Sequence, residues 1–260
     1  MEQDLVNHFK DLLKEPQRNR SKAIAKISKE IPKLITRAQN LAVMRVATLE
    51  EVEEVVKGLK GNKAPRPYGY TAEFYQACWN FIGEEILEVL EEVCIHQKVW
   101  PGLNSTLLTL IPKSAHSESV EGFRPITLCN VIYKIIATLM VKKLKPILPN
   151  IISPEQTGFM EGRKILDGLV VSQKIIHTLK QKKELGMMIK LDLSKVYDIL
   201  NWKYLEAILQ AYGFCNRWVK WILSMISTPN FSILLNEHQQ QPLMLQEAYA
   251  KGTLCPPFCS

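Results

Sequence analysis

The sequence predicts an α+β protein in which helices dominate. Three observations support this fold class: most apolar residues recur at helical spacing, a few short apolar runs read as strands, and the two kinds of segment do not alternate regularly. The chain has 260 residues, of which 47 % are hydrophobic, enough for one large domain or two modest ones. The N-terminus lacks the pattern of a signal peptide, and no apolar run reaches the roughly 18 residues of a transmembrane helix. We therefore expect an intracellular protein, nuclear or cytoplasmic, with no membrane partner.

The first expected helices lie within the N-terminal sixty residues. Residues 3–30 carry apolar positions at helical spacing, with a polar break at "EPQRNRSK". The stretch "TLEEVEEVVKGLK" predicts a helix in which Thr48 is the N-cap and Glu51 completes a capping box. Its apolar stripe consists of Val52, Val55, Val56 and Leu59.

The middle of the chain combines helices with one strand. "GNKAPRPYGY" predicts a loop from its proline and glycine content, and "TAEFYQACWNFIGEEILEVLEEVCIHQKV" predicts a long helical segment broken near Gly83. "STLLTLIPK" has the composition of a strand, and the polar "SAHSESVEG" that follows predicts a loop. "PITLCNVIYKIIATLMVKKLKPIL" predicts an apolar helix that begins at its proline.

The last third continues the same mixture of elements. "ILDGLVVSQKIIHTLKQKKE" predicts a helix and "GMMIKLDLS" a buried strand. "WKYLEAILQAYGF" predicts a helix closed by Gly213, and "NRWVKWILSMIS" a further helix. "FSILLNEH" predicts a final strand.

The net charge and the cysteine content place few limits on which partners or metals the protein could bind. The net charge of +7 permits a polyanionic partner such as nucleic acid, although many proteins with this charge bind none. The six cysteines have no regular spacing, so most are expected to be buried thiols. Cys255 and Cys259 lie close together in a C-x3-C arrangement, but His238 is the only nearby candidate for a third ligand, which disfavours a zinc site.

The stretch "MMIKLDLSKVYD" is the strongest candidate for chemistry. It places Asp192 in an apolar strand, with Asp198 six residues further on. A buried carboxylate without a partner is costly, so Asp192 is expected to be paired, to cap a helix or to bind a metal. The pattern alone favours capping of the following helix over metal binding.

Six stretches in order carry a resemblance to a known family. They are "GNKAPRPYGYTAEFYQACW", "STLLTLIPK", "GFRPITLCNVIYKIIA", "IISPEQTGFMEGRKILD", "IKLDLSKVYDILNW" and "AYGFCNRWVKWI". The series resembles the reverse transcriptases of non-LTR (LINE-type) retrotransposons, most closely those of plants, from about residue 6 to residue 245. The resemblance implies a right-hand polymerase with fingers, palm and thumb that copies an RNA template into DNA from a primer with two Mg²⁺ ions.

The resemblance also assigns roles to individual residues. "LDLSKVYD" is similar to the first palm motif, in which Asp192 would be the catalytic, metal-binding aspartate and the Leu193 carbonyl a further ligand, as suits the hard Mg²⁺ ion. The residues similar to those that face the incoming nucleotide are Lys113, Arg124 and Tyr197. The residues similar to those along the template strand are Gly162 and Arg163. For Lys113 and Arg163 taken alone, a solvated surface charge is the favoured interpretation. For Tyr197 taken alone, core packing and the role beneath the sugar of the nucleotide are equally favoured.

The same resemblance predicts the organisation of the chain. We expect a helical N-terminal extension over 1–57, a fingers subdomain over 58–185 and a partial palm over 186–245. Residues 246–260 are expected to form a disordered tail, and the thumb is expected to be absent. Incomplete cover of strand edges and apolar helix faces favours aggregation, and no specific protein partner can be inferred.

Several positions depart from the family pattern. In "NKAPRPYGY", Arg66 stands where the family has glycine and Tyr68 where it has aspartate, which removes a strong turn sequence. "DILNW" lacks an arginine and a second aspartate of the usual Asp-Arg-Val-Asp-Trp. A motif near Arg-Gly-Leu-Arg-Gln-Gly-Asp-Pro-Leu-Ser-Pro and the later Tyr-Ala-Asp-Asp, which supplies the other catalytic carboxylates, do not occur in the 260 residues.

The tail "QEAYAKGTLCPPFCS" explains the first of these losses. One permitted codon set for these residues, read from the third base of the Gln246 codon, encodes Arg-Gly-Leu-Arg-Lys-Gly-Asp-Pro-Leu-Ser-Pro-Phe-Leu-Phe. This is the missing motif with one Gln-to-Lys change, so we expect a change of reading frame shortly before Gln246 and no ligand on Cys255 or Cys259.

The expected function follows from both the resemblance and the departures. We expect an RNA-directed DNA polymerase domain, truncated and inactive as this chain, that does not hold Mg²⁺ tightly because Asp192 stands in place of three carboxylates. One alternative is a nucleic-acid-binding remnant without catalysis, because binding needs charge more than a complete active site. The other is a helical interaction protein or a pseudogene product without function. We also expect no target-cutting activity, because the chain starts without the endonuclease that precedes the polymerase in this family.

Overall fold

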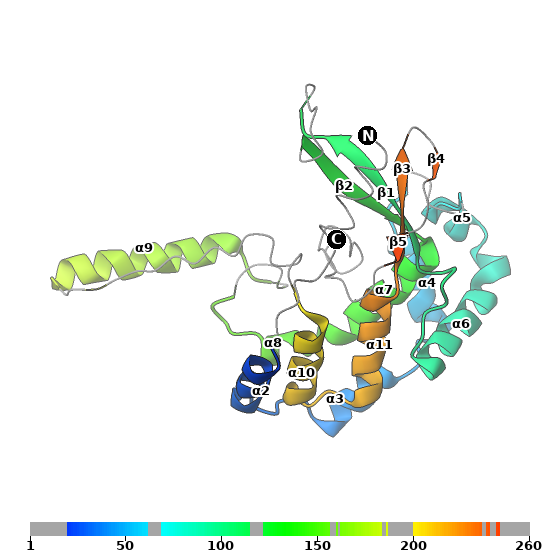
Figure 1. Cartoon of the computed structure of the whole chain (residues 1–260). Coiled ribbons are helices and arrows are strands. Elements are labelled where there is room, and N and C mark those ends of the chain that lie inside the picture. The colour runs from blue at the N-terminus through cyan, green and yellow to red at the C-terminus, as the bar shows by residue number, and fades with distance from the viewer. Residues whose placement is uncertain are drawn as a thin grey trace. The chain divides into compact units, whose positions relative to one another are not determined.

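The fold is seen in a computed structural model, which describes residues 20–61, 69–114, 122–156, 160, 162–183, 186, 200–235, 238–239 and 243–244 (Figure 1). The chain divides into two compact units. The larger unit comprises Met1–Lys143 and Lys195–Ser260, and the smaller comprises Leu144–Ser194. Helices and strands occur together, so the predicted mixed α and β character is confirmed. None of the helices in the described part is both long and apolar enough to cross a membrane.

A small sheet forms one side of the larger unit (Figure 1). Its strands are β1 (Ser105–Pro112), β2 (Phe123–Cys129), β3 (Asn230–Leu235), β4 (His238–Gln239) and β5 (Leu243–Met244). The strand order is β2-β1-β3-β4, and β5 also pairs with β3. β1 runs antiparallel to β2 and parallel to β3, which joins segments more than a hundred residues apart. The predicted strands at "STLLTLIPK" and "FSILLNEH" are thereby confirmed.

The prediction of a helix beginning at Pro125 was wrong in its first residues. "PITLC" belongs to β2, in which Thr127 pairs with Leu108 and Cys129 with Thr106, and helix α7 (Val131–Leu144) begins only after Asn130. The Asn130 side chain accepts a hydrogen bond from the Ile132 N–H at the helix start. Proline is tolerated in this strand because β2 lies at the sheet edge, where one side of the backbone needs no partner.

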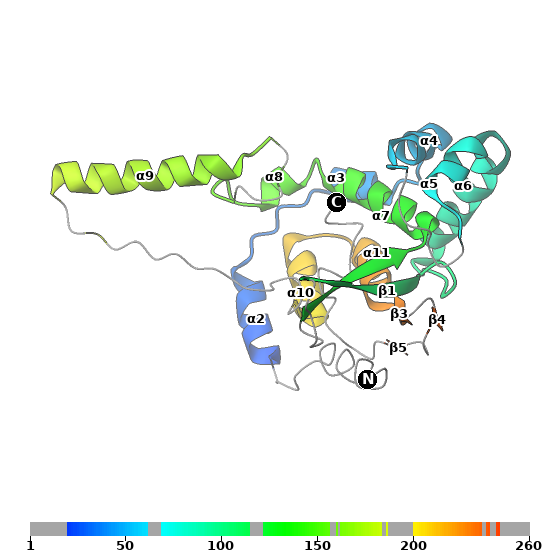
Figure 2. The same ribbon diagram turned by 90° about the horizontal axis from the view of Figure 1, so that it is seen from above.

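Three helices lie together beside the sheet in both views (Figures 1 and 2). They are α4 (Leu49–Gly58), α5 (Ala72–Ala77) and α6 (Trp79–His96). The predicted capping box of α4 is confirmed, because Thr48 Oγ1 accepts from the Glu51 N–H and Glu51 accepts from the Thr48 N–H. Its predicted apolar stripe is also confirmed, with Val52, Val55, Val56 and Leu59 all buried.

The break in the helical segment over 71–99 lies at Cys78 rather than at Gly83. Cys78 ends α5 and precedes α6, whereas Gly83 is buried inside α6. A Cβ on Gly83 would approach the Trp79 ring to 3.1 Å. The glycine is therefore explained by close packing of the Trp79 indole on its own helix, and it does not interrupt the helix.

The N-terminal part of the described chain packs on a corner formed by two later helices. Helices α2 (Ser21–Glu30) and α3 (Arg37–Met44) contact α10 (Trp202–Tyr212) and α11 (Asn216–Ser227), respectively. The predicted closure of α10 at Gly213 is confirmed, since this residue has a φ of 101°. The Asn40 side chain donates to the Gly213 carbonyl at 2.8 Å and accepts from the Cys215 N–H at 2.7 Å. One side chain of α3 thus ties together both sides of the α10–α11 turn.

The core of the larger unit surrounds α7. Seven residues of this helix are buried, as the predicted apolar character requires, and the Tyr133 hydroxyl donates to the Met225 carbonyl of α11 at 2.9 Å. The described cysteines are free thiols, and both Cys94 and Cys129 are buried.

The smaller unit contains α8 (Leu148–Ile151) and α9 (Ile165–Lys182). The predicted helix at "ILDGLVVSQKIIHTLKQKKE" is confirmed by α9. Gly186, the first residue of the predicted "GMMIKLDLS" strand, packs near Leu179, and the rest of that stretch lies outside the described residues.

Candidate functional site

The end of β1 and the start of β2, which pair with each other, bring two of the predicted site residues together. Arg124 in β2 pairs with Ile111 in β1. Beyond the end of β1, the Lys113 N–H still donates to the Gly122 carbonyl at 2.8 Å, so the ladder continues for one more pair. Lys113 and Arg124 are therefore diagonal neighbours on one face, a relation that corresponds to about 7–8 Å between backbone positions.

This face of the hairpin is open to solvent. Lys113 and Arg124 are exposed, and so are the two aliphatic residues that share the face, Ile111 at 46 % and Ile126 at 42 %. The opposite face is closed, because Thr106 and Leu108 of β1 are buried with Phe231 of β3. The burial alternation of the strands thus turns two basic side chains outward. A guanidinium and an ammonium at this separation can contact one phosphate chain together.

Gly162 and Arg163 lie in the smaller unit, ahead of α9. Gly162 has a φ of 74°, a left-handed conformation that glycine adopts without strain. A Cβ placed on it would meet no atom of the described residues within 4 Å, so backbone conformation rather than lack of space favours glycine here. The Arg163 guanidinium donates to the carbonyl oxygens of Ser153 at 2.6 Å and Gln156 at 2.7 Å. Arg163 therefore shapes the segment before α9, a role that the sequence did not indicate.

The predicted metal and sugar residues cannot be placed. Asp192, Leu193 and Tyr197 lie outside the described residues, as do Arg66, Tyr68, Asp198 and the tail from Gln246 to Ser260. Among the residues that are described, no three His, Cys, Asp or Glu side chains gather as a metal site would require. The assignment of Mg²⁺ to Asp192 stays a prediction.

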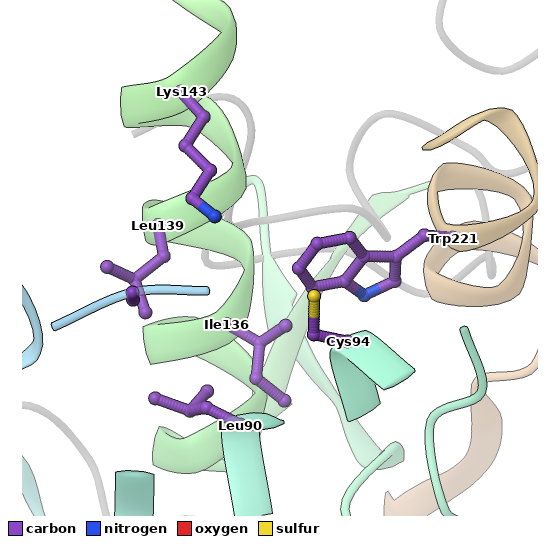
Figure 3. A pocket seen from close by; sticks show the side chains of 7 residues that line it. Leu90, Cys94, Ile136, Leu139, Lys143 and Trp221 are labelled. Carbon is purple, nitrogen blue, oxygen red and sulfur yellow. The ribbon is translucent and has the colours of Figure 1, made fainter. Parts of the chain in front are cut away.

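A small cavity in the larger unit collects polar groups that the sequence did not single out (Figure 3). It has a volume of about 20 Å³, room for about one water molecule, and α6, α7 and α11 contribute Cys94, Lys143 and Trp221 to its lining. The Lys143 Nζ points toward the Trp221 indole, 5.8 Å from the ring centroid, and donates to the Arg45 carbonyl. Nothing in the sequence marks Lys143 apart from its neighbour Lys142, which is exposed and pairs with Glu54 at 2.9 Å.

Burial changes the pKa values of the ionisable side chains in and beside this cavity. Burial lowers the pKa of the Lys143 ammonium and raises the pKa of the Cys94 thiol. Burial also acts to raise the pKa of Glu51, but hydrogen bonds from the Thr48 N–H and from Arg45 outweigh it and lower that pKa. A thiol held in its neutral form is a poor nucleophile, so the cluster acts as a structural junction between α3, α4, α6, α7 and α11.

Comparison with known proteins gives one family. The sequence pattern of the reverse transcriptase (RNA-dependent DNA polymerase) family matches residues 111–252, more than half of the chain. The match begins on β1 and includes both Lys113 and Arg124. It also reaches into residues 246–260, so the predicted change of reading frame stays a prediction.

Three curated relatives are proteins of transposable elements. The uncharacterized 149 kDa protein of transposon TX1 from Xenopus laevis is 27 % identical over 80 % of this chain and 16 % of its own length. The Pol polyprotein of retrotransposable element R1 from Bradysia coprophila is 28 % identical over 59 % of this chain and 15 % of its own length. The Pol polyprotein of retrotransposable element R2 from Popillia japonica is 21 % identical over 58 % of this chain and 21 % of its own length.

The chain thus spans about a fifth or less of the length of these relatives. The matches confirm the predicted resemblance to reverse transcriptases of non-LTR retrotransposons. On the family match over 111–252, the chain belongs to the reverse transcriptase (RNA-dependent DNA polymerase) family.

Proposed function

We propose that this domain binds an RNA template with a DNA primer, and that the Lys113–Arg124 face of the hairpin holds the triphosphate of the incoming nucleotide. The observation that carries the proposal is the β1–β2 register, which gives these two basic residues one exposed face within the segment that matches the family. Two fixed positive charges suit a nucleotide triphosphate because Arg offers paired donors to phosphate oxygens and Lys adds a point charge.

The remaining proposed roles are those that the resemblance to the family implies, residue by residue. Asp192 and the Leu193 carbonyl would hold Mg²⁺, with Tyr197 beneath the sugar, and Gly162 and Arg163 would border the template. Residues 58–185 would form the fingers and 186–245 the beginning of the palm, preceded by the helical segment 1–57. Bound Mg²⁺ supplies charge neutralisation at the transferred phosphate, and the chain's own task is to position template, primer and nucleotide.

A polypeptide limited to these 260 residues is proposed to be catalytically silent, whatever the length of the protein to which they belong. Of the three palm carboxylates that the family uses, Asp192 is the one present at a matching motif, and a single carboxylate holds two Mg²⁺ ions poorly. We expect no primer extension on poly(rA)–oligo(dT) with Mg²⁺ or Mn²⁺. Extension that disappears in Asp192→Asn would refute this part of the proposal and leave the binding role intact.

Nucleotide binding is tested on the hairpin. The polypeptide bound to poly(rA)–oligo(dT) is titrated with dTTP and Mg²⁺, and Arg124→Gln and Lys113→Gln are compared with Arg37→Gln, a matched change of an exposed residue in α3. The two hairpin variants are expected to weaken dTTP binding about 10-fold or more, because each removes a charge-assisted contact. Equal binding by Arg124→Gln and Arg37→Gln would contradict the assignment of this face.

Nucleic-acid binding without catalysis is the second candidate function, and the net charge of +7 favours it. Filter binding of the template–primer across a salt titration should give affinities that fall steeply with salt, because displaced counterions are released from the phosphates. A flat salt response would count against the basic surface and against both candidate functions.

A further inference from the structure

A second exposed surface, separate from the hairpin, is formed by aromatic rings. Tyr70 precedes α5 and Phe74 lies within it, and their ring centroids are 4.6 Å apart at an interplanar angle of 38°. Tyr70 is 52 % exposed and Phe74 39 % exposed. Phe74 in turn meets the buried Tyr75 edge-on at 5.5 Å. The core thus holds Phe74, Phe74 supports Tyr70, and half of Tyr70 faces solvent.

A supported ring of this kind is suited to stacking. Exposed aromatic side chains bind unpaired bases with little sequence preference because every base has a π-face. A ring that is already held by a neighbour loses little conformational freedom when a base stacks on it. Tyr70 has this property, and its half exposure leaves area for a planar ligand.

The charges around Tyr70 are compatible with a polyanion. Lys60 is exposed beyond the end of α4, a helix that contacts α5. The acidic residue of α5, Glu73, has its carboxylate against Gly61, where Oε1 lies 2.7 Å from the position of a Cβ on that glycine.

The chain provides an internal contrast in Phe81. At 82 % exposure, this residue of α6 presents more of its surface than Tyr70, yet it shares an exposed helix face with Glu84, Glu85, Glu88 and Glu92. Four glutamates on one face repel a phosphate backbone. Exposure alone would favour Phe81 as the stacking residue, whereas exposure combined with charge favours Tyr70.

We propose that Tyr70, supported by Phe74, is a stacking site for an unpaired base of single-stranded nucleic acid, such as the template strand. The inference rests on the proposed function as a nucleic-acid-binding domain and adds a contact that the hairpin and palm motifs do not supply. The occupant is a nucleobase, so the contact is independent of base identity and makes little use of charge.

The test is fluorescence anisotropy of the full chain with a labelled single-stranded oligonucleotide (U20 and dT20 in parallel) at three salt concentrations. Tyr70→Ala and Tyr70→Leu are expected to weaken binding about 5- to 100-fold, because both remove the aromatic face. Tyr70→Phe and the control Phe81→Ala are expected to stay within about 2-fold of the unaltered chain. The dependence of log Kd on log salt should be unchanged in all four variants, since none removes a cation.

The outcomes separate this inference from the proposed function. If the unaltered chain binds in a salt-dependent manner and neither Tyr70→Ala nor Tyr70→Leu weakens binding, the stacking site is refuted and the proposed function stands. The stacking site is likewise refuted if Phe81→Ala weakens binding as much as Tyr70→Ala. If the unaltered chain does not bind, both proposals fall. Thermal unfolding followed by tryptophan fluorescence confirms that each variant is folded, and Tyr70→Leu serves if the alanine variant is not.

Discussion

Asn40 connects the N-terminal segment to the corner between α10 and α11, and its removal gives a measurable loss of stability. Its side chain donates to the Gly213 carbonyl at 2.8 Å and accepts from the Cys215 N–H at 2.7 Å, and both bonds are partly buried. Asn40→Ala removes both bonds and leaves two backbone groups without these partners. Unsatisfied backbone groups in a partly buried turn make the loss larger than that of an exposed contact.

The magnitude follows from these two bonds. Each contributes about 1 kcal/mol net, and alanine recovers about 0.6 kcal/mol through its higher helix propensity within α3. The expected loss is therefore about 1.4 kcal/mol, close to 10-fold in the ratio of folded to unfolded chain. Asn40→Asp keeps an acceptor for the Cys215 N–H, but at neutral pH its carboxylate has no donor for the Gly213 carbonyl, so it should not restore the stability that asparagine gives.

Urea unfolding followed by tryptophan fluorescence measures this directly, because Trp218 and Trp221 are buried in α11 next to the corner. Asn150→Ala, a change of an exposed asparagine in α8, is the control and should shift the unfolding free energy by less than about 0.5 kcal/mol. A loss below about 0.5 kcal/mol for Asn40→Ala would show that the bridge does not hold the corner together.

Three further predictions concern other parts of the chain. Gly213→Ala should destabilise the protein by about 1–2 kcal/mol in the same urea assay, because its φ of 101° is strained for alanine and the added Cβ would lie 2.8 Å from Lys33 Cγ. Between the lowered pKa of Lys143 and its ordinary value of 10.5, the unfolded chain binds the proton more tightly than the folded chain, so the contribution of Lys143 to stability should rise with pH in that window, against the opposite contribution of Cys94, whose pKa is raised. Lys143→Met should abolish that rise when unfolding is measured from about pH 8 to pH 10.5, and an unchanged pH profile would argue against the burial of the ammonium. Arg124→Gln should leave template–primer binding without dTTP within about 2-fold and its salt slope unchanged, because the proposed contact of Arg124 is with the incoming nucleotide; a slope lower by about 1 would place Arg124 on the template–primer phosphates instead.

Local signals predicted the elements that depend on short-range chemistry. The capping box at Thr48, the left-handed residue Gly213 and the apolar stripe of α4 are fixed by neighbours within a few residues, and all three are present as predicted. The two errors arose where packing or a distant partner decides. Proline commonly begins a helix, but pairing with β1 makes the segment at Pro125 a strand. Glycine commonly interrupts a helix, but at Gly83 it makes room for the Trp79 ring, which packs over it.

For the candidate site too, the sequence predicted which residues matter, and the structure showed how those it describes are arranged. The motif order pointed to the family and to Lys113 and Arg124 as basic residues of interest, because residue types at fixed spacing are visible in one dimension. Their common exposed face follows from the antiparallel register of β1 and β2, which no local pattern specifies. The carbonyl contacts of Arg163 and the lowered pKa of Lys143 likewise depend on which backbone and rings surround each side chain.

The sequence by itself determined the family, the helix-rich α+β class and the ends of several helices, because caps, periodicity and motif order are local properties of the chain. Only the tertiary structure decided that β1 and β3 pair across more than a hundred residues, that Asn40 bridges the α10–α11 turn, and that Phe81 is more exposed than Tyr70. The physical reason is that hydrogen-bond partners, burial and the local balance of charge are set by how the folded chain brings its residues together.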